Sequence, residues 1–480
     1  MSLMSWVTTP RIRRGLAASA VVLASGGLVL FRADARPSPI LTPVDPGVVL
    51  PSGANVASFA GPGVHGTLAL GQSTVLAGTP QRLFADLTMV ADRGAEQKEH
   101  APLAMVITLD TSGSMQGEKI SQAKSAITRL LREMKDADEV AFVRYSDRAE
   151  LVQPLERVGF VRESLIERVN TLQAGGGTAI PLGLEAALRT LAGEASGRVR
   201  RVVLVSDGLD SSRAEAERLA ASSFERGITI SSMGIGLDFD ESYMGGVARA
   251  GHGNFGFVND GPALAMFLDK ELKETAATTV EGATVRVVLP NGVRFVRASG
   301  ADARPDGAGV DLKVGSLYAG EERRVLLELE TSMTDGTAAM ISGNASWQRV
   351  EAGMAAANIP ALQLVAVNDP ARVDQSKDGT VLARAASVNA SERQLEAAEA
   401  FAKGDQARAD ALIDKNIADL KAARAMAPAP VASALGAQES SYEATKETFD
   451  TVAPSSTAGK FHAKAAAAKN WVNSTKPATY

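Results

Sequence analysis

The sequence contains no cysteine and only four histidines, and these absences exclude several kinds of active site. Without cysteine the chain forms no disulfide, no thiolate metal site and no cysteine nucleophile. Zinc is disfavoured too, because it prefers Cys and His ligands. The histidines are far apart in the sequence and outside any H-E-x-x-H pattern, so a histidine-based hydrolase is poorly supported. They are His65, His100, His252 and His462.

A strong charge of one sign is also missing. Lys and Arg number 50 and Asp and Glu number 55, which gives a net charge of -5. A surface that binds nucleic acid normally carries clustered positive charge, so nucleic acid is not expected as a partner. The chain has no G-x-x-x-x-G-K-[ST] phosphate loop either. Its 480 residues are enough for two or three domains.

Long apolar runs are scarce, and the one candidate membrane segment lies near the N-terminus. Arg11, Arg13 and Arg14 precede an uncharged run over Gly15–Phe31, which is typical of an export signal. Ala33–Ala35 matches a small-x-small cleavage site. The run is at the short end of the roughly 20 residues that span a bilayer, so a signal peptide and an uncleaved anchor both remain open. Either predicts an extracytoplasmic protein: periplasmic, membrane-anchored or secreted.

Apolar strands alternate with helical patterns over residues 101–276. Leu103–Leu109 and Val199–Val205 are almost continuous apolar runs, as expected for strands buried on both faces of a sheet. Glu118–Met134 has apolar residues at helical spacing instead. This alternation predicts an α/β fold, a doubly wound and mostly parallel sheet with helices on both faces.

Strand-rich segments flank this unit at residues 64–100 and 277–367. Both show approximate alternation of apolar and polar residues, and Asn291-Gly292 and Asp306-Gly307 mark turns in the second segment. We predict an antiparallel β-sandwich for residues 277–367. If the strands of residues 64–100 form its first part, the α/β unit is an insertion within the sandwich.

The remaining segments are predicted mainly from composition. A Pro-, Gly- and Ser-rich stretch predicts a linker, and two amphipathic patterns around Gly404-Asp405 predict a helical hairpin. The Ala-, Ser-, Thr- and Lys-rich C-terminal part is predicted to be a low-complexity tail, with a candidate helix near Ser441–Phe449. The segments are 1–36 for the signal peptide or anchor, 37–63 for the linker, 386–426 for the hairpin and 427–480 for the tail.

Oxygen-bearing side chains follow both buried strands. Asp110, Ser112 and Ser114 come at every second residue of a D-T-S-G-S turn, and Asp207 directly follows the second strand. Thr178 ends a glycine run just before a predicted helix. Because parallel strands end at the same edge of a sheet, we expect these groups to converge there. Oxygen-only ligands suit the hard cations Mg²⁺, Ca²⁺ and Mn²⁺.

These motifs resemble the complete metal-ion-dependent adhesion site of von Willebrand factor type A domains. The order and spacing of D-T-S-G-S-M, G-G-G-T and V-S-D-G fit that family over about residues 103–275. The resemblance implies three hydroxyl ligands and two carboxylates that act directly or through water. The corresponding residues are Ser112, Ser114 and Thr178 for the hydroxyls, and Asp110 and Asp207 for the carboxylates.

The resemblance also implies a binding function rather than an enzyme. Two carboxylates and neutral hydroxyls balance a divalent cation and leave a position for water, which an Asp or Glu side chain of a protein partner can replace. The whole chain resembles bacterial export-targeted proteins related to inter-α-trypsin-inhibitor heavy chains and calcium-activated chloride-channel-like proteins. This implies an exported or membrane-anchored adhesion or scaffold module, with the membrane contacted through the N-terminal segment if it is uncleaved.

Three alternatives remain open at this point. In the first, the chain is a metal-dependent hydrolase or self-cleaving protease, although no general base stands beside the motifs in the sequence. In the second, it is an accessory subunit of an ATPase or chelatase-like complex, which requires a cytoplasmic location. In the third, the polar residues only cap the helix that begins near Gln116, which leaves Thr178 and Asp207 unexplained.

Overall fold

The structure is a computed structural model that describes residues 55–93, 101–193, 197–207, 210–258, 260–350 and 352–475. The predicted signal peptide or anchor of residues 1–36 lies outside these described residues. Among the helices within them, none is both long and apolar enough to cross a membrane.

The predicted α/β unit forms around a six-stranded sheet in the order β10-β9-β8-β5-β6-β7. Neighbouring strands are parallel except β6 and β7, which are antiparallel. All eight positions of β5 are buried, as its continuous apolar run predicts. The strands are β5 (Leu103–Asp110), β6 (Glu139–Tyr145), β7 (Ala149–Arg157), β8 (Val199–Ser206), β9 (Ile228–Ile235) and β10 (His252–Val258).

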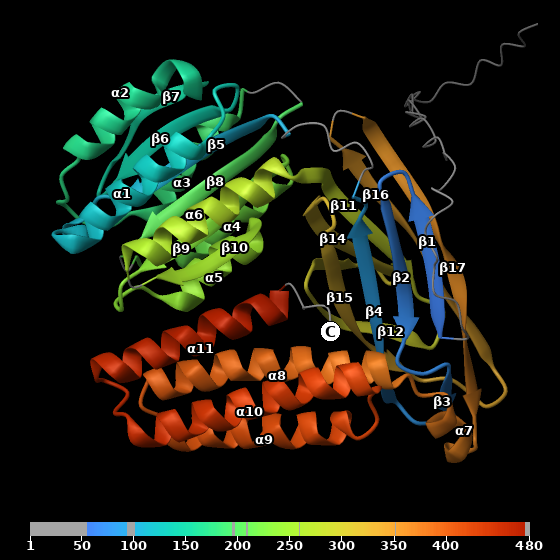
Figure 1. Ribbon diagram of the computed structural model, residues 1–480. Coiled ribbons are helices and arrows are strands. Elements are labelled where there is room, and N and C mark those ends of the chain that lie inside the picture. The colour runs from blue at the N-terminus through green and yellow to red at the C-terminus, as the bar shows by residue number, and fades with distance from the viewer. Residues whose placement is uncertain are drawn as a thin grey trace, which may run out of the picture. The chain divides into compact units, whose positions relative to one another are not determined.

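Helices cover both faces of this sheet (Figure 1). Because side chains alternate along a strand, Met105 and Ile107 of β5 pack with one set of helices and Ala104 and Val106 with the other. The first set is α1 (Glu118–Glu133), α2 (Val158–Thr171) and α6 (Gly261–Ala276). The second set is α3 (Ile180–Leu191), α4 (Arg213–Phe224) and α5 (Glu241–Ala250). The doubly wound α/β prediction is therefore confirmed.

The flanking strands form a sandwich whose sheets have the orders β1-β2-β4-β15-β12 and β13-β14-β11-β16-β17-β3. Strand β4, before the α/β unit in the chain, pairs with β15 after it, so the α/β unit is an insertion within the sandwich. Before the insertion come β1 (Val56–Gly61), β2 (Val64–Leu70), β3 (Thr74–Leu76) and β4 (Gln81–Ala91). After it come β11 (Thr278–Val288), β12 (Val293–Ser299), β13 (Asp302–Pro305), β14 (Gly309–Tyr318), β15 (Glu322–Thr331), β16 (Ala338–Arg349) and β17 (Gly353–Val367).

Strand β1 corrects the predicted linker of residues 37–63, because Val56–Gly61 is part of the sandwich. Ala57 and Phe59 point into the sandwich core, and the strand pairs antiparallel with β2. The Gly- and Pro-rich surroundings hide this short alternation in the sequence. Residues 37–54 of the predicted linker lie outside the described residues.

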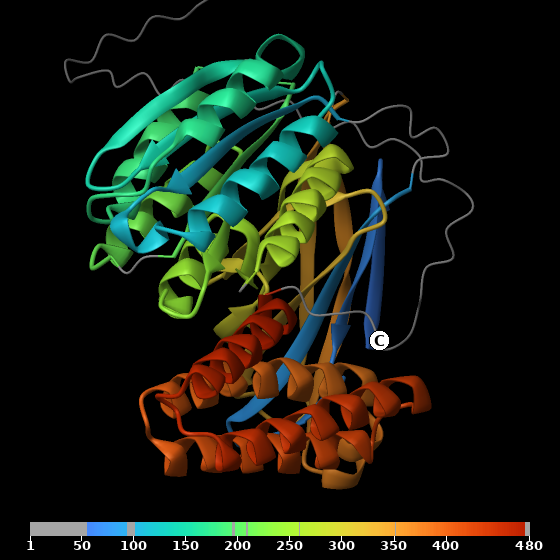
Figure 2. The same ribbon diagram turned by 60° about the vertical axis from the view of Figure 1, so that its left-hand side comes forward.

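The chain ends in helices α8 (Gly379–Ala402), α9 (Gln406–Arg424), α10 (Ala429–Thr451) and α11 (Thr457–Thr475), preceded by the short α7 (Pro370–Gln375). Helices α8 and α9 correspond to the predicted hairpin. The prediction of a low-complexity tail for residues 427–480 is wrong over α10 and α11. Tyr442, Phe449 and Ala463 are buried in one core with the hairpin, and Phe449 stacks on Phe401 at 3.9 Å. Figure 2 shows these orange and red helices packed together.

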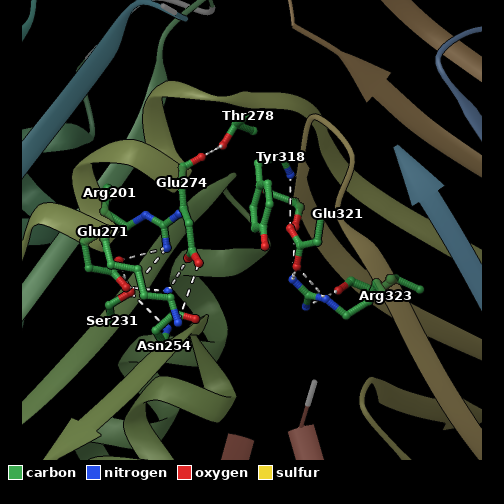
Figure 3. Close-up of polar contacts among 12 residues, drawn as sticks. Arg201, Ser231, Asn254, Glu271, Glu274, Thr278, Tyr318, Glu321 and Arg323 are labelled. Carbon is green, nitrogen blue, oxygen red and sulfur yellow. Dashed lines mark hydrogen bonds and ion pairs between the residues drawn. The ribbon is translucent and has the colours of Figure 1, made fainter. Parts of the chain in front are cut away.

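A buried polar cluster lies around Arg201, near the beginning of β8 (Figure 3). The Glu271 carboxylate of α6 accepts a hydrogen bond from Ser231 Oγ at 2.6 Å and lies 3.4 Å from the Arg201 guanidinium. Asn254 donates to Glu271 and, at 2.7 Å, to Glu274. We call Arg201, Ser231, Asn254 and Glu271 the basal cluster. It joins α6 to three neighbouring strands of the sheet.

Candidate functional site

The candidate site begins where β5 ends, at Asp110. One oxygen of this carboxylate accepts a hydrogen bond from the backbone N–H of Ser112 at 2.8 Å, and the other accepts from Ser206 Oγ at 2.6 Å. Ser206 is the last residue of β8, the parallel neighbour of β5. Asp110 is therefore held by its own turn and by the adjacent strand, and it fixes the course of the chain into the short helical turn Gly113–Met115.

Three further side chains of the predicted site lie in direct contact. Ser112 Oγ is 3.0 Å from Ser114 Oγ, and Ser114 Oγ donates to Asp207 Oδ1 at 2.8 Å. Ser112 and Asp207 are each 1% exposed, whereas Ser114 is exposed. The four residues Asp110, Ser112, Ser114 and Asp207 thus form one polar group, which we call the apical site. The apical site meets solvent on the side of Ser114.

The loop that carries Thr178 is tied to the same turn through its backbone. The N–H of Gly113 donates to the carbonyl of Gly176 at 2.9 Å, and the N–H of Gly175 donates to the carbonyl of Thr111 at 2.7 Å. Thr178 follows two residues later and is half-buried. Among the hydrogen bonds of the described residues, none joins the Thr178 hydroxyl to the apical site. The structure therefore brings the Thr178 loop to the turn without a direct contact of its hydroxyl.

Gly176 lies where this loop passes closest to the turn after β6. Its φ is +88°, and a Cβ at this position would lie 2.7 Å from Oδ1 of Asp147. A residue with a side chain would be strained by both its backbone conformation and this contact. Asp147 itself accepts a hydrogen bond from Ser146 Oγ at 2.9 Å, as a turn residue does.

Burial dominates the electrostatics of the apical site. It raises the pKa of Asp110, because a buried carboxylate loses solvation, and the nearby Asp207 adds to the increase. The hydrogen bonds from Ser206 and Ser112 act in the opposite direction. Burial also raises the pKa of Tyr145, which lies beside this carboxylate, well above its usual range. Two buried carboxylates close together favour a cation between or beside them.

The sequence motifs missed one polar residue of this region, Lys119, and one contact, that of Ser206. Lys119, in the first turn of α1, forms an ion pair with Oδ2 of Asp207 through its ammonium group. Ser206 was part of the V-S-D-G motif, but its contact with Asp110 was not predicted. A signal for Lys119 exists in the sequence, because a basic residue in the first turn of a helix opposes the helix dipole and therefore suggests another role.

The donor set fits a hard divalent cation. Ligands at about 2.1 Å from an octahedral Mg²⁺ lie about 3.0 Å from their neighbours. The hydrogen-bond distances of 3.0 Å between Ser112 and Ser114 and 2.8 Å between Ser114 and Asp207 are compatible with this spacing. In the parts of the chain that the structure describes, no three His, Cys, Asp or Glu side chains gather as a metal cluster. The apical site is instead a mixture of hydroxyls and two carboxylates.

Known proteins share the fold of this unit. Residues 104–270 match the family model of the von Willebrand factor type A domain. The solved structure named von Willebrand factor type A from Catenulispora acidiphila is 21% identical and covers 90% of this chain and 99% of its own, with a TM-score of 0.65. The ArnB paralog VWA2 from Sulfolobus acidocaldarius is 13% identical over 84% of this chain and 99% of its own, with a TM-score of 0.57.

Two curated relatives match about half of the chain. The uncharacterized protein sll0103 of Synechocystis is 25% identical over 279 residues, 55% of this chain and 65% of the relative. The uncharacterized protein YfbK of Escherichia coli is 26% identical over 265 residues, 52% of this chain and 45% of the relative. The chain thus spans less than two thirds of the length of either relative.

Proposed function

Because residues 104–270 form a von Willebrand factor type A domain, a protein-interaction module, we propose that this chain captures an acidic side chain of a protein partner through a divalent cation. The cation is bound at the apical site. The observation that carries the proposal is the contact of Ser112, Ser114 and Asp207 at oxygen–oxygen distances suited to a hard cation, with Ser114 open to solvent.

Some residues of the site bind the cation directly, and others fix the geometry and charge around it. Ser112 and Ser114 hold it through their hydroxyls, and Thr178 adds a third hydroxyl from the neighbouring loop. Asp207 and Asp110 supply negative charge, and Asp110 also fixes the turn through its contacts with Ser206 and the Ser112 backbone. When bound, Mg²⁺, Ca²⁺ or Mn²⁺ supplies a positive centre that accepts a carboxylate oxygen from outside. The partner's carboxylate approaches the cation from the solvent-exposed side of the site, beside Ser114.

We also propose an extracytoplasmic location, supported by Arg11, Arg13 and Arg14 before the apolar run Gly15–Phe31. Externally added protease should cleave a C-terminal tag on spheroplasts while a cytoplasmic marker stays intact. Protection of the tag until the cells are lysed would contradict this location. The resemblance to inhibitor heavy chains and chloride-channel-like proteins stays a prediction.

Manganese offers a direct test of carboxylate capture. The full chain is stripped with EDTA and loaded with Mn²⁺, and the relaxation rate of water protons is measured. Bound Mn²⁺ that keeps a water ligand enhances this rate, and acetate, a stand-in for an Asp side chain, should reduce the enhancement by displacing that water. Acetamide has nearly the same shape without the charge and should leave the enhancement unchanged.

Two variants make the assignment specific. Asp110→Asn keeps the shape of the side chain but removes a buried charge, and it should abolish Mn²⁺ binding while the circular dichroism spectrum stays native. Asp238→Ala removes an exposed aspartate after β9 and should bind Mn²⁺ and acetate like the wild type. Equal Mn²⁺ binding by Asp110→Asn and the wild type would overturn the site, and equal effects of acetate and acetamide would overturn the capture mechanism.

A further inference from the structure

A lysine already occupies one side of the apical site. The ammonium group of Lys119 is paired with Oδ2 of Asp207, while Oδ1 of the same carboxylate accepts the hydrogen bond from Ser114. The Asp207 side chain is completely buried, and the Lys119 side chain is 26% exposed. The two oxygens of Asp207 therefore face different partners, a cationic side chain on one side and the serine hydroxyls on the other.

The position of Lys119 is not explained by helix stability. Lys119 is the second residue of α1, where the partial positive charge of the helix N-terminus disfavours a cation. The chain nevertheless leaves room for it. Gly236, after the end of β9, has a φ of +79°, and a Cβ there would lie 2.9 Å from Cε of Lys119. The lysine is thus directed across the end of the sheet toward Asp207.

The position of Lys119 changes the net charge around the apical site. Asp110 and Asp207 contribute two negative charges and Lys119 one positive charge, so these three side chains and a divalent cation sum to +1. Without the lysine this sum would be zero. A positive side chain on the same carboxylate repels the incoming cation and attracts an incoming anion. These two effects have opposite signs for the two successive binding steps.

We infer that Lys119 is a resident counter-cation of the apical site: it weakens binding of the divalent cation and strengthens capture of a carboxylate by the cation-loaded site. This role rests on the proposed function, since it concerns the same site. It makes Lys119 a residue that sets affinity and selectivity, because a net positive loaded site prefers an anion to a neutral amide or hydroxyl ligand. Its effect on the cation is measurable without any carboxylate ligand.

The test measures the two steps separately on the full chain with Lys119→Met. Isothermal titration calorimetry with Mg²⁺ alone gives the cation affinity, and we expect Lys119→Met to bind on the order of tenfold more tightly than the wild type. Water-proton relaxation with saturating Mn²⁺ then gives the acetate affinity, which we expect to fall on the order of tenfold. A residue with only a structural role would not shift the two affinities in opposite directions.

Controls keep the outcomes distinguishable. Lys119→Arg keeps the charge and should behave like the wild type in both titrations, even if Lys119→Met folds poorly. Lys124 lies on the same helix, but its ammonium group donates a hydrogen bond to the carbonyl of Asn170. The control variant Lys124→Met should therefore change neither affinity. Unchanged or weaker Mg²⁺ binding by Lys119→Met, or a loss of Mg²⁺ affinity in Lys119→Arg, would overturn the role. Absence of Mg²⁺ binding by the wild type would instead overturn the proposed function itself.

Discussion

Strand β8 has a buried charged residue near each end, and the two are used differently. Arg201 of the basal cluster is 6% exposed and faces Glu271, which is 0% exposed and also accepts a hydrogen bond from Ser231. Asp207 of the apical site follows the other end. From the rise per residue of a β-strand, it lies roughly 20 Å from Arg201. Its neighbour Ser114 is exposed, and its charge partner Lys119 is partly so.

The difference indicates that the basal cluster is suited to stabilising the fold and the apical site to binding a ligand. In the basal cluster each charge faces an opposite charge or a hydrogen-bond donor inside the protein. All four side chains of the cluster are buried. The apical site holds two carboxylates and two hydroxyls, its one lysine pairs with Asp207 alone, and the group is open to solvent at Ser114. A covered and balanced cluster holds elements together, whereas an open cluster with excess negative charge is suited to a cation.

Breaking the basal cluster should give the largest effect on stability. Glu271→Ala leaves the Arg201 guanidinium buried without its carboxylate, and we expect the free energy of unfolding to fall by about 3–5 kcal/mol. Urea unfolding followed by circular dichroism measures this loss. Mg²⁺ affinity of the folded protein should stay unchanged. A double change, Arg201→Met with Glu271→Leu, should recover most of the loss, and failure to do so would contradict a charge-based explanation.

A smaller effect on stability is expected from Glu281 of β11, which lies near Arg200 and Arg201. Burial raises its pKa from an ordinary 4.5 to about 7, although the two arginines oppose the increase. The folded state therefore binds this proton more tightly than the unfolded chain. The resulting stabilisation is present below about pH 4.5 and is lost as the pH rises through 7. At pH 8, Glu281→Gln should be more stable than the wild type by about 3 kcal/mol.

The pH dependence is checked by urea unfolding of both proteins between pH 5 and 8 in EDTA. The difference between Glu281→Gln and the wild type should shrink toward pH 5, since protonated Glu and Gln are then alike. A difference that is constant across this range would show that the carboxyl group of Glu281 does not titrate there.

The smallest effect on stability is expected at the loop that approaches the apical site. Gly176→Ala combines a positive φ with a close contact to Asp147, so we expect a loss of about 1 kcal/mol in stability and a severalfold loss of Mg²⁺ affinity. Gly177→Ala is the matched control, because its Cβ would have 4.0 Å to the nearest atom of Asp147. Calorimetry with Mg²⁺ compares the two variants, and similar affinities would contradict the link between this loop and the site.

Much of the fold could be predicted because its signals are local. The apolar runs that became β5 and β8 are buried along nearly their whole length. Apart from the candidate helix near Ser441–Phe449, helices α10 and α11 were not predicted, because their stability depends on contacts with distant residues. Tyr442 and Phe449 have few apolar neighbours in sequence, and their partners are on α8 and α9.

The parts of the candidate site that depend on local sequence could be predicted, and the contacts between distant residues could not. Asp110, Ser112 and Ser114 lie within one turn, and parallel strands place Asp207 at the same edge. The ion pair between Lys119 and Asp207 was not predictable, because it joins residues from two elements that no motif connects. The position of the Thr178 hydroxyl also depends on tertiary structure, since the loop before it is made of glycines.

Crystals of the full chain grown with Mn²⁺ and measured at an energy where manganese scatters anomalously give the most direct test of cation binding. We predict one strong anomalous peak within coordination distance of the Ser112 and Ser114 hydroxyls, absent from the Asp207→Ala variant. No peak at these hydroxyls under saturating Mn²⁺, or an equal peak in Asp207→Ala, would contradict a cation site at the end of β8.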